Sequence, residues 1–399
     1  MTSRDRVLTA LSHREPDRVP IDLGGSIVTG INSMAYQNVK RFLGFKDFRS
    51  RVTNIILMLS EVEREFYERW KIDVVPLDRY EAAPGVPLSG EWFEHPLPDG
   101  QPAWFPKGFN PRIRDDGTWE LVRDGIVTDV LNAGSGSFVP AYHPLKDATV
   151  NDLDSFELPR ISDAELEYLY KRAKYLYENT EYAIFGWFNG SILETSQFLC
   201  SWDGFMVRLA IDKEFAHKLL KKLTDAVIRD LELYTDAVGK YIQVIGFGDD
   251  FGIQSGLQMS PDLFREMLKP YLARIYSKAH QLTDAYLLLH SCGSVSSLIE
   301  DFIELGVDVL NPVQTSAANM EPEYLKSNFG DRISFWGGGC DVQKILPLGS
   351  TDEIREDVKM RLRIFGEGGG FVFAPIHNIQ ADVPARNIVT MYDAACGNI

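Results

Sequence analysis

The chain has 399 residues, of which 45% are hydrophobic, so it can bury the core of one large barrel or of roughly two to three ordinary domains. Its formal net charge of −16 argues against a nucleic acid, an anionic membrane surface or another bulky polyanion as the main ligand. Four cysteines in so long a chain exclude a disulfide scaffold, and in a reducing compartment they are thiols or metal ligands.

The sequence contains no run of about 18 uninterrupted apolar residues. Charges interrupt the N-terminal segment where a signal peptide would be continuously apolar. We therefore expect a soluble, cytoplasmic protein without a membrane or nucleic-acid partner. Self-association into a homo-oligomer stays open.

Apolar strand-like runs alternate with amphipathic helical stretches along the whole chain. The predicted strands are 18–24, 73–78, 182–189, 241–250, 285–292, 307–314, 333–340 and 370–378. The clearest predicted helices are 54–70, 213–238, 260–282 and 351–365. This alternation predicts an α/β fold, a (β/α)8 TIM barrel that spans residues 1–399 as a single domain. Residues 79–150 break the rhythm with antiparallel-like strands, and we expect them to form an insertion over the barrel mouth.

Each predicted strand ends in polar residues, and a barrel gathers these ends around one mouth, where the active sites of this fold occur. The residues at these ends are Asp22, Asp78, Asn189, Asp249, Asp250, His290, Cys292, Asn311, Gln314, Cys340, His377 and Asn378.

His290 and Cys292 are two residues apart on one predicted strand, so their side chains share a face. Cys340 follows three glycines at the end of another strand and can approach them across the mouth. One imidazole and two thiolates suit zinc, and three protein ligands with an open fourth position are typical of a catalytic zinc site. The alternative is that the cysteines are ordinary buried side chains.

Four stretches of the chain resemble the uroporphyrinogen decarboxylase superfamily, and within it the zinc-dependent methyltransferases that work with corrinoid proteins, of the O-demethylase methyltransferase I type. These stretches are "SRDRVLTALSHREPDRVPIDLGG", "GDDFGIQSGLQMSPDLFREMLKPY", the region from "HSCGSVSSLIEDFIELGVDVLNPVQ" to "ISFWGGGCD", and "APIHNIQADVPARNIVTMYDAA". The resemblance implies a TIM barrel with zinc on His290, Cys292 and Cys340. It also implies transfer of a methyl group from a small methylated molecule to the cobalt of a corrinoid (cobalamin). No Asp-x-His-x-x-Gly signature occurs, so the corrinoid is expected on a partner protein.

The remaining site predictions are catalytic and substrate-binding residues. Asp249 and Asp250 are adjacent, so only one faces the mouth, where it could fill the fourth zinc position, orient His290 or move a proton; the alternative is a helix or loop cap. His377 matches the late histidine of the family and has an orienting, an acid–base or a purely structural role. The expected substrate-binding residues are Asp22, Trp187, Asn189, Phe247, Gln314, Trp336 and Asn378. The aromatic members favour a methoxylated aromatic substrate, although each could also be core packing.

Three alternative functions stay open. A uroporphyrinogen decarboxylase binds a polycarboxylate, yet the segment Asp22–Ser26 has no arginine where such enzymes carry an arginine-rich motif. A methylcorrinoid:thiol methyltransferase would use the same zinc in a related reaction. A catalytically silent barrel would only bind a small molecule or a partner.

Overall fold

A parallel sheet of seven strands forms the centre of the protein, which we describe from a computed structural model that covers residues 1–132 and 136–398. The strands are β3 (Val74–Leu77), β12 (Ala183–Asn189), β13 (Val244–Gly248), β16 (Tyr286–His290), β17 (Val309–Asn311), β18 (Ser334–Trp336) and β19 (Phe371–Val372). They lie side by side in the order β19-β18-β17-β16-β13-β12-β3, and every pair is parallel. Parallel neighbours require crossover connections, which here are mostly helical.

The segment around Ile21 closes this sheet. Ile21 forms parallel bridges with Phe373, which follows β19, and with Ile72, which precedes β3. The Asp22 amide donates to the Phe373 carbonyl at 2.8 Å, and the Asp73 amide donates to the Ile21 carbonyl at 2.8 Å. Both edges of the sheet are therefore paired with one segment, and the predicted barrel is confirmed. The eighth strand is short because the chain turns at Gly24, whose φ is 77°.

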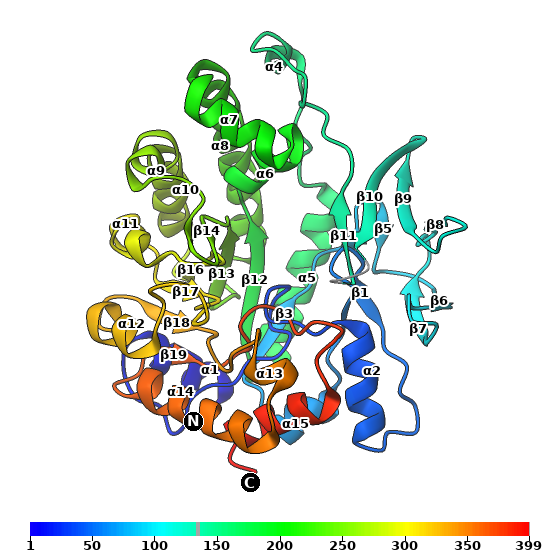
Figure 1. Ribbon diagram of the computed structural model, residues 1–399, viewed down its shortest axis with the longest axis vertical. Helices are drawn as coiled ribbons and strands as arrows, with labels where there is room; N and C mark the ends of the chain where they lie inside the picture. Colours follow the sequence, from blue (N-terminus) through cyan, green and yellow to red (C-terminus); the bar gives the residue numbers. More distant parts are fainter. Residues whose placement is uncertain (133–135, 399) are drawn as a thin grey trace.

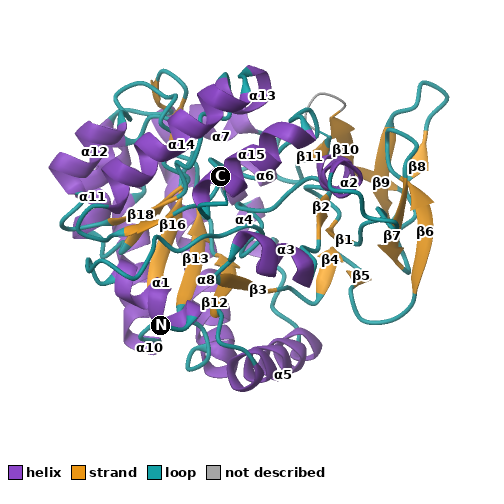
Figure 2. Ribbon diagram, turned by 90° about the horizontal axis from the view of Figure 1, so that it is seen from below, coloured by secondary structure: helices purple, strands orange, loops and turns teal. Residues whose placement is uncertain are grey.

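Helices cover the outside of the barrel (Figures 1 and 2). They are α1 (Ser3–Leu11), α2 (Ser33–Phe42), α3 (Arg64–Trp70), α4 (Asp152–Ser155), α5 (Asp163–Asn179), α6 (Leu193–Cys200), α7 (Trp202–Ile211), α8 (Lys213–Val238), α9 (Pro261–Met267), α10 (Lys269–Leu282), α11 (Ile299–Glu304), α12 (Pro322–Phe329), α13 (Ile345–Leu348), α14 (Thr351–Gly366) and α15 (Ala385–Ala395). None of the helices in the described ranges is both long enough and apolar enough to span a membrane.

Two hydrophobic layers follow from the alternation of side chains along the strands. On β16, Leu288 belongs to the cluster inside the barrel together with Phe185, Trp187 and Trp336. Its neighbours Leu287 and Leu289 belong to the larger cluster between the sheet and the helices. The interior of the barrel is therefore filled by side chains, and only its end is free for a site.

Two of the four helices named from the sequence were predicted closely, and the other two differ for local reasons. The structure has α8 at Lys213–Val238 and α14 at Thr351–Gly366, as predicted. The predicted helix 260–282 is divided at Leu268 into α9 and α10, because Pro270 cannot donate an i→i−4 hydrogen bond. The predicted helix 54–70 is helical only in α3, because its first part forms the antiparallel strands β1 (Val52–Asn54) and β2 (Leu59–Ser60).

The predicted insertion 79–150 contains antiparallel strands, with residues 133–135 outside the described part. The strands are β4 (Glu81–Ala83), β5 (Val86–Pro87), β6 (Trp92–Pro96), β7 (Pro102–Pro106), β8 (Arg112–Ile113), β9 (Trp119–Arg123), β10 (Ile126–Asn132) and β11 (Ser137–Pro140). A separate cluster that includes Phe105, Phe109 and Trp119 forms their core. They lie beside the barrel next to β1 (Figure 1). Trp104 and Arg51 form a parallel backbone bridge there. Whether the insertion also covers the mouth stays a prediction.

The carboxylate of Asp73 is a buried anchor beneath the closing segment. It accepts hydrogen bonds from Arg6 at 2.6 Å, from Arg18 at 2.7 Å and from the Ile21 amide at 2.9 Å. The Asp73 side chain is fully buried, so each donor replaces a water molecule that the carboxylate has lost.

Asp73→Asn is expected to destabilise the protein by about 3 kcal/mol, because it leaves two arginines facing a neutral amide in a buried place. Chemical denaturation measures this free energy of unfolding. The matched control is Glu68→Gln, which removes an exposed ion pair to Arg64 and should change nothing measurable. Equal stability of the Asp73 variant and the wild type would contradict the role of this anchor.

Candidate metal centre

Three side chains of the types that bind metal ions meet at the carboxyl end of the barrel. The ligand atoms of His290, Cys292 and His377 all lie within 4.8 Å of one another, and we call these three residues the ligand cluster. His290 is the last residue of β16, Cys292 follows two residues later, and His377 lies in the loop after β19. The Cys292 sulfur is 3.3 Å from His290 Nε2. One thiol and two imidazoles within this distance can share one ion of the zinc type.

Both imidazoles are oriented by neutral amides. His290 Nδ1 donates to Asn311 Oδ1 at 2.5 Å, and the Asn311 amide nitrogen donates in turn to the Trp336 carbonyl at 2.8 Å. His377 Nδ1 donates to Asn378 Oδ1 at 2.5 Å. A proton on Nδ1 leaves the lone pair of each imidazole on Nε2, which is the tautomer that a metal ion requires.

Asp250 is the acidic residue next to the ligand cluster. Its Oδ1 accepts the Cys292 amide at 2.7 Å and lies 3.9 Å from His290 Nε2. Burial raises the pKa of the Cys292 thiol well above its usual value, and the carboxylates of Asp250 and Glu194 raise it further. The thiol is therefore protonated at neutral pH until a cation binds.

His377 is held uncharged in the ligand cluster. Burial lowers its pKa to about 4, and the neighbouring charge of His290 acts in the same direction. The rings of the two histidines are 5.4 Å apart. His377 is therefore uncharged at neutral pH, and its Nε2 lone pair can bind a cation, whereas its catalytic role stays a prediction.

The structure does not bring Cys340 into the ligand cluster. Cys340 is fully buried in the layer between the sheet and the helices. Burial raises the pKa of its thiol, and Asp357 of α14 raises it further through its charge and a hydrogen bond. The backbone after the three glycines thus directs this side chain towards α14, and its role as a zinc ligand stays a prediction.

Of the two adjacent aspartates, Asp250 faces the ligand cluster and Asp249 faces the start of α6. Asp249 is buried and accepts the amides of Ile192 at 2.9 Å and of Glu194 at 2.8 Å, so it acts as a helix cap, one of the two expected alternatives. Burial raises its pKa to about 7 against the lowering effect of these amides.

Glu194 was not predicted. It lies in the first turn of α6, and burial raises its pKa well above the usual value, with Asp250 and Asp249 adding to the effect. Its only sequence signal was its place five residues after the end of β12.

The predicted substrate-binding residues occupy different surroundings. Asp22 and Trp336 are fully buried, and the Trp336 indole nitrogen donates a hydrogen bond to the Asp22 carboxylate at 2.8 Å. Burial raises the pKa of Asp22 to about 6. Phe247 packs against Phe188 and Tyr276 in the layer outside the sheet.

The other four lie nearer the mouth. The Trp187 ring is 6.3 Å from the His290 ring, and Asn189 is exposed at the end of β12. Gln314 accepts the Gly293 amide at 2.8 Å, and Asn378 orients His377.

The barrel with titratable and ligating groups at its carboxyl end defines an α/β-barrel enzyme. Residues 132–397 match the uroporphyrinogen decarboxylase (URO-D) family, which is more than half of the chain, and the chain belongs to this family.

Individual relatives are more distant. The chain is 26% identical over 184 residues to uroporphyrinogen decarboxylase of Anaeromyxobacter dehalogenans, which covers 45% of this chain and 47% of that protein. It is 26% identical over 188 residues to that of Pseudoalteromonas atlantica, over 46% of this chain and 48% of that one. The chain therefore matches about half the length of these curated relatives. A solved methyltransferase from Methanosarcina mazei has a TM-score of 0.59 at 20% identity, over 100% of this chain and 99% of that chain, and shares the fold.

Asn311→Leu is expected to lower the affinity for zinc about 10- to 100-fold, because the His290 ring loses the acceptor that fixes its orientation and tautomer. Competition with a chromogenic chelator measures this affinity. Asn328→Leu, at an exposed position of α12, is the matched control. An unchanged affinity of the Asn311 variant would contradict the orienting role of this amide.

Zinc binding is expected to release one proton, from the Cys292 thiol, and to tighten about tenfold per pH unit near neutrality. The affinity rises with pH because the pKa of the thiol is raised and its proton must leave before the sulfur binds the ion. Calorimetry in buffers of different ionisation enthalpy counts the protons, and Cys292→Ser should abolish the release. A count of two that returns to one in Cys340→Ser would instead show that Cys340 joins the site.

Proposed function

We propose that this protein is a zinc-dependent methyltransferase that moves a methyl group from a small methylated molecule to the cobalt of a separate corrinoid protein. The single observation that carries the proposal is the ligand cluster of His290, Cys292 and His377 at the active-site end of a URO-D family barrel. The methyltransferase with the same fold adds support.

The residues present fit zinc. A thiol and two neutral imidazoles are soft to borderline ligands, and three protein ligands leave a position for a substrate atom. When bound there, zinc supplies a Lewis acid that stabilises the negative charge developing on the oxygen or sulfur that loses the methyl group.

The side chains around the cluster position it. Asn311 and Asn378 keep Nε2 of each histidine available. Asp250 fixes the backbone at Cys292, and its carboxylate is close enough to take part in proton transfer to the departing group. Asp249 holds the first turn of α6 and with it Glu194 beside Asp250.

The methyl donor that we propose is a methoxylated aromatic compound. Trp187 supports this choice, since its indole lies at the side of His290 and offers an apolar face to a ring. The cobalt would be carried by a partner protein, because the sequence contains no corrinoid-binding signature. A transfer from a methylated corrinoid to a thiol is a separate alternative, in which the ion would bind the thiolate that accepts the methyl group.

The alternative function is decarboxylation of a carboxylated cyclic substrate, which the 26% identical decarboxylases favour. The buried Asp22 side chain, which accepts the Gly25 amide, lies in the loop where such a substrate would need cations. A binding protein without activity is the third possibility.

Purified protein is expected to hold about one zinc per chain, and His290→Ala and Cys292→Ser should lose it. With zinc and a reduced corrinoid protein, the wild type should transfer methyl groups from methoxyarenes, which the absorption spectrum of the cobalt centre records. A metal-free active enzyme that releases carbon dioxide would establish the decarboxylase instead. Zinc binding without transfer from methoxyarenes, methanol, methylamines or methyl thiols would favour a binding protein.

A further inference from the structure

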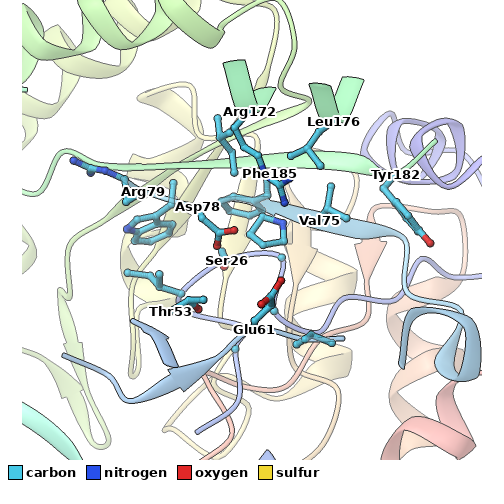
Figure 3. Close-up of a pocket in the computed structure, with 18 of the residues that line it drawn as sticks. Ser26, Thr53, Glu61, Val75, Asp78, Arg79, Arg172, Leu176, Tyr182 and Phe185 are labelled. Atoms are coloured by element: carbon cyan, nitrogen blue, oxygen red, sulfur yellow. The ribbon is translucent and has the colours of Figure 1, made fainter. Parts of the chain in front are cut away.

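A cleft opens beside the ligand cluster between β3, α5 and the segments that follow the first strand. We call it the side cleft, and it is lined by Ser26, Glu61, Asp78, Arg172 and Trp187 among others (Figure 3). Its volume is about 530 Å³, which is enough for a small organic molecule. Trp187 connects the two places, because the same indole that lines the side cleft lies 6.3 Å from the His290 ring.

Two oppositely charged side chains in the side cleft make no direct polar contact with any described residue. Asp78 follows β3 and Arg172 lies on α5, and both are half-buried. In the described part of the chain, neither side chain takes part in a hydrogen bond or an ion pair. They are too far apart to pair with each other, although the charge of Arg172 acts on Asp78. Figure 3 shows Arg172 extending from the helix and Asp78 from the end of the strand.

The other two arginines that line the side cleft have acidic partners. Arg79 contacts Glu165, and Arg64 contacts Glu68 at 2.9 Å. Arg172 is therefore the arginine of the lining that is available for an anion.

Partly buried charges without a partner are costly, and proteins usually satisfy them. Burial raises the pKa of Asp78 to about 6 against the lowering effect of Arg172, and Glu61 raises it further, so a cation in contact with Asp78 would relieve the cost. A carboxylate at Arg172 would form charge-assisted hydrogen bonds in the same way. Satisfying both groups with one molecule needs a positive and a negative group in that molecule.

Several aromatic side chains line the side cleft together with the two charges. Phe185, Trp187, Tyr67 and Tyr182 all line the side cleft. Phe185 and Trp187 belong to the buried cluster inside the barrel, with ring centroids 6.2 Å apart. Such faces bind a flat apolar body and also attract an ammonium group.

We propose that the side cleft binds a small zwitterion with an aromatic body, its ammonium group towards Asp78 and its carboxylate towards Arg172. The aromatic body extends along Trp187 to the ligand cluster. The identification of this zwitterion as the methyl donor rests on the proposed function, whereas its binding does not.

Calorimetric titration with four probes that share a para-methoxyphenyl ring tests the proposal. O-methyltyrosine carries both charges, para-methoxyphenylpropionate only the carboxylate, para-methoxyphenethylamine only the ammonium, and para-propylanisole neither. We expect O-methyltyrosine to bind at least about tenfold more tightly than either singly charged probe. Arg172→Gln should remove only the gain in affinity that the carboxylate of a probe provides. Asp78→Asn should remove only the gain that the ammonium group provides.

Lys174→Gln is the matched control, because it removes a cation from the same helix outside the side cleft. It should leave all four affinities unchanged, and thermal melting confirms that each variant is folded. Absence of binding, equal binding of the uncharged probe, or equal loss of affinity for all probes in both variants would overturn the proposal.

The two proposals fail separately. Charge-dependent binding without any methyl transfer would refute the methyltransferase and leave the side cleft as a zwitterion site. Methyl transfer from uncharged methoxyarenes that is insensitive to Arg172→Gln and Asp78→Asn would refute the side cleft and leave the methyltransferase.

Discussion

The pairing of one short segment with both edges of the sheet is the constraint on which the site depends. Ile21 bridges the segments at Ile72 and Phe373, and the buried carboxylate of Asp73 holds it there with two arginines. Closure brings the strand ends into a ring, so His290 and His377, far apart in sequence, become neighbours. In an open sheet β19, which precedes His377, would be an edge strand, with β18 and β17 between it and β16.

Much of the fold could be predicted from the sequence because hydrophobic periodicity reports burial directly. Seven of the eight predicted strands form the sheet, and the eighth, 18–24, contributes the bridging residue Ile21. Helix α8 ends at Val238, as predicted. The helix expected at 54–70 was the clear miss, because pairing of Asn32 with Leu59 places that stretch in a small antiparallel ladder. Long-range pairing of this kind overrides a local amphipathic pattern and leaves no mark in it.

The sequence predicts which residues lie at the strand ends of the site. It does not predict the direction in which each side chain points. Spacing placed His290 and Cys292 together, and the structure adds His377 to them. Spacing could not say that the backbone after the three glycines sends Cys340 outward to Asp357, since glycines accept many conformations. Asp78 and Arg172 lie on different elements, and only the packing of α5 against β3 shows that they face one cavity.

The use of amides behind both histidines has an electrostatic consequence. A carboxylate in the place of Asn311 or Asn378 would increase the negative charge on the imidazole to which it is hydrogen-bonded. A neutral amide oxygen does not have this effect. A divalent ion held by one thiolate and two such rings would keep an excess of positive charge. The carboxylate of Asp250, 3.9 Å from His290 Nε2, would offset that charge, so the balance at this end of the barrel depends on the aspartate and not on the groups behind the imidazoles.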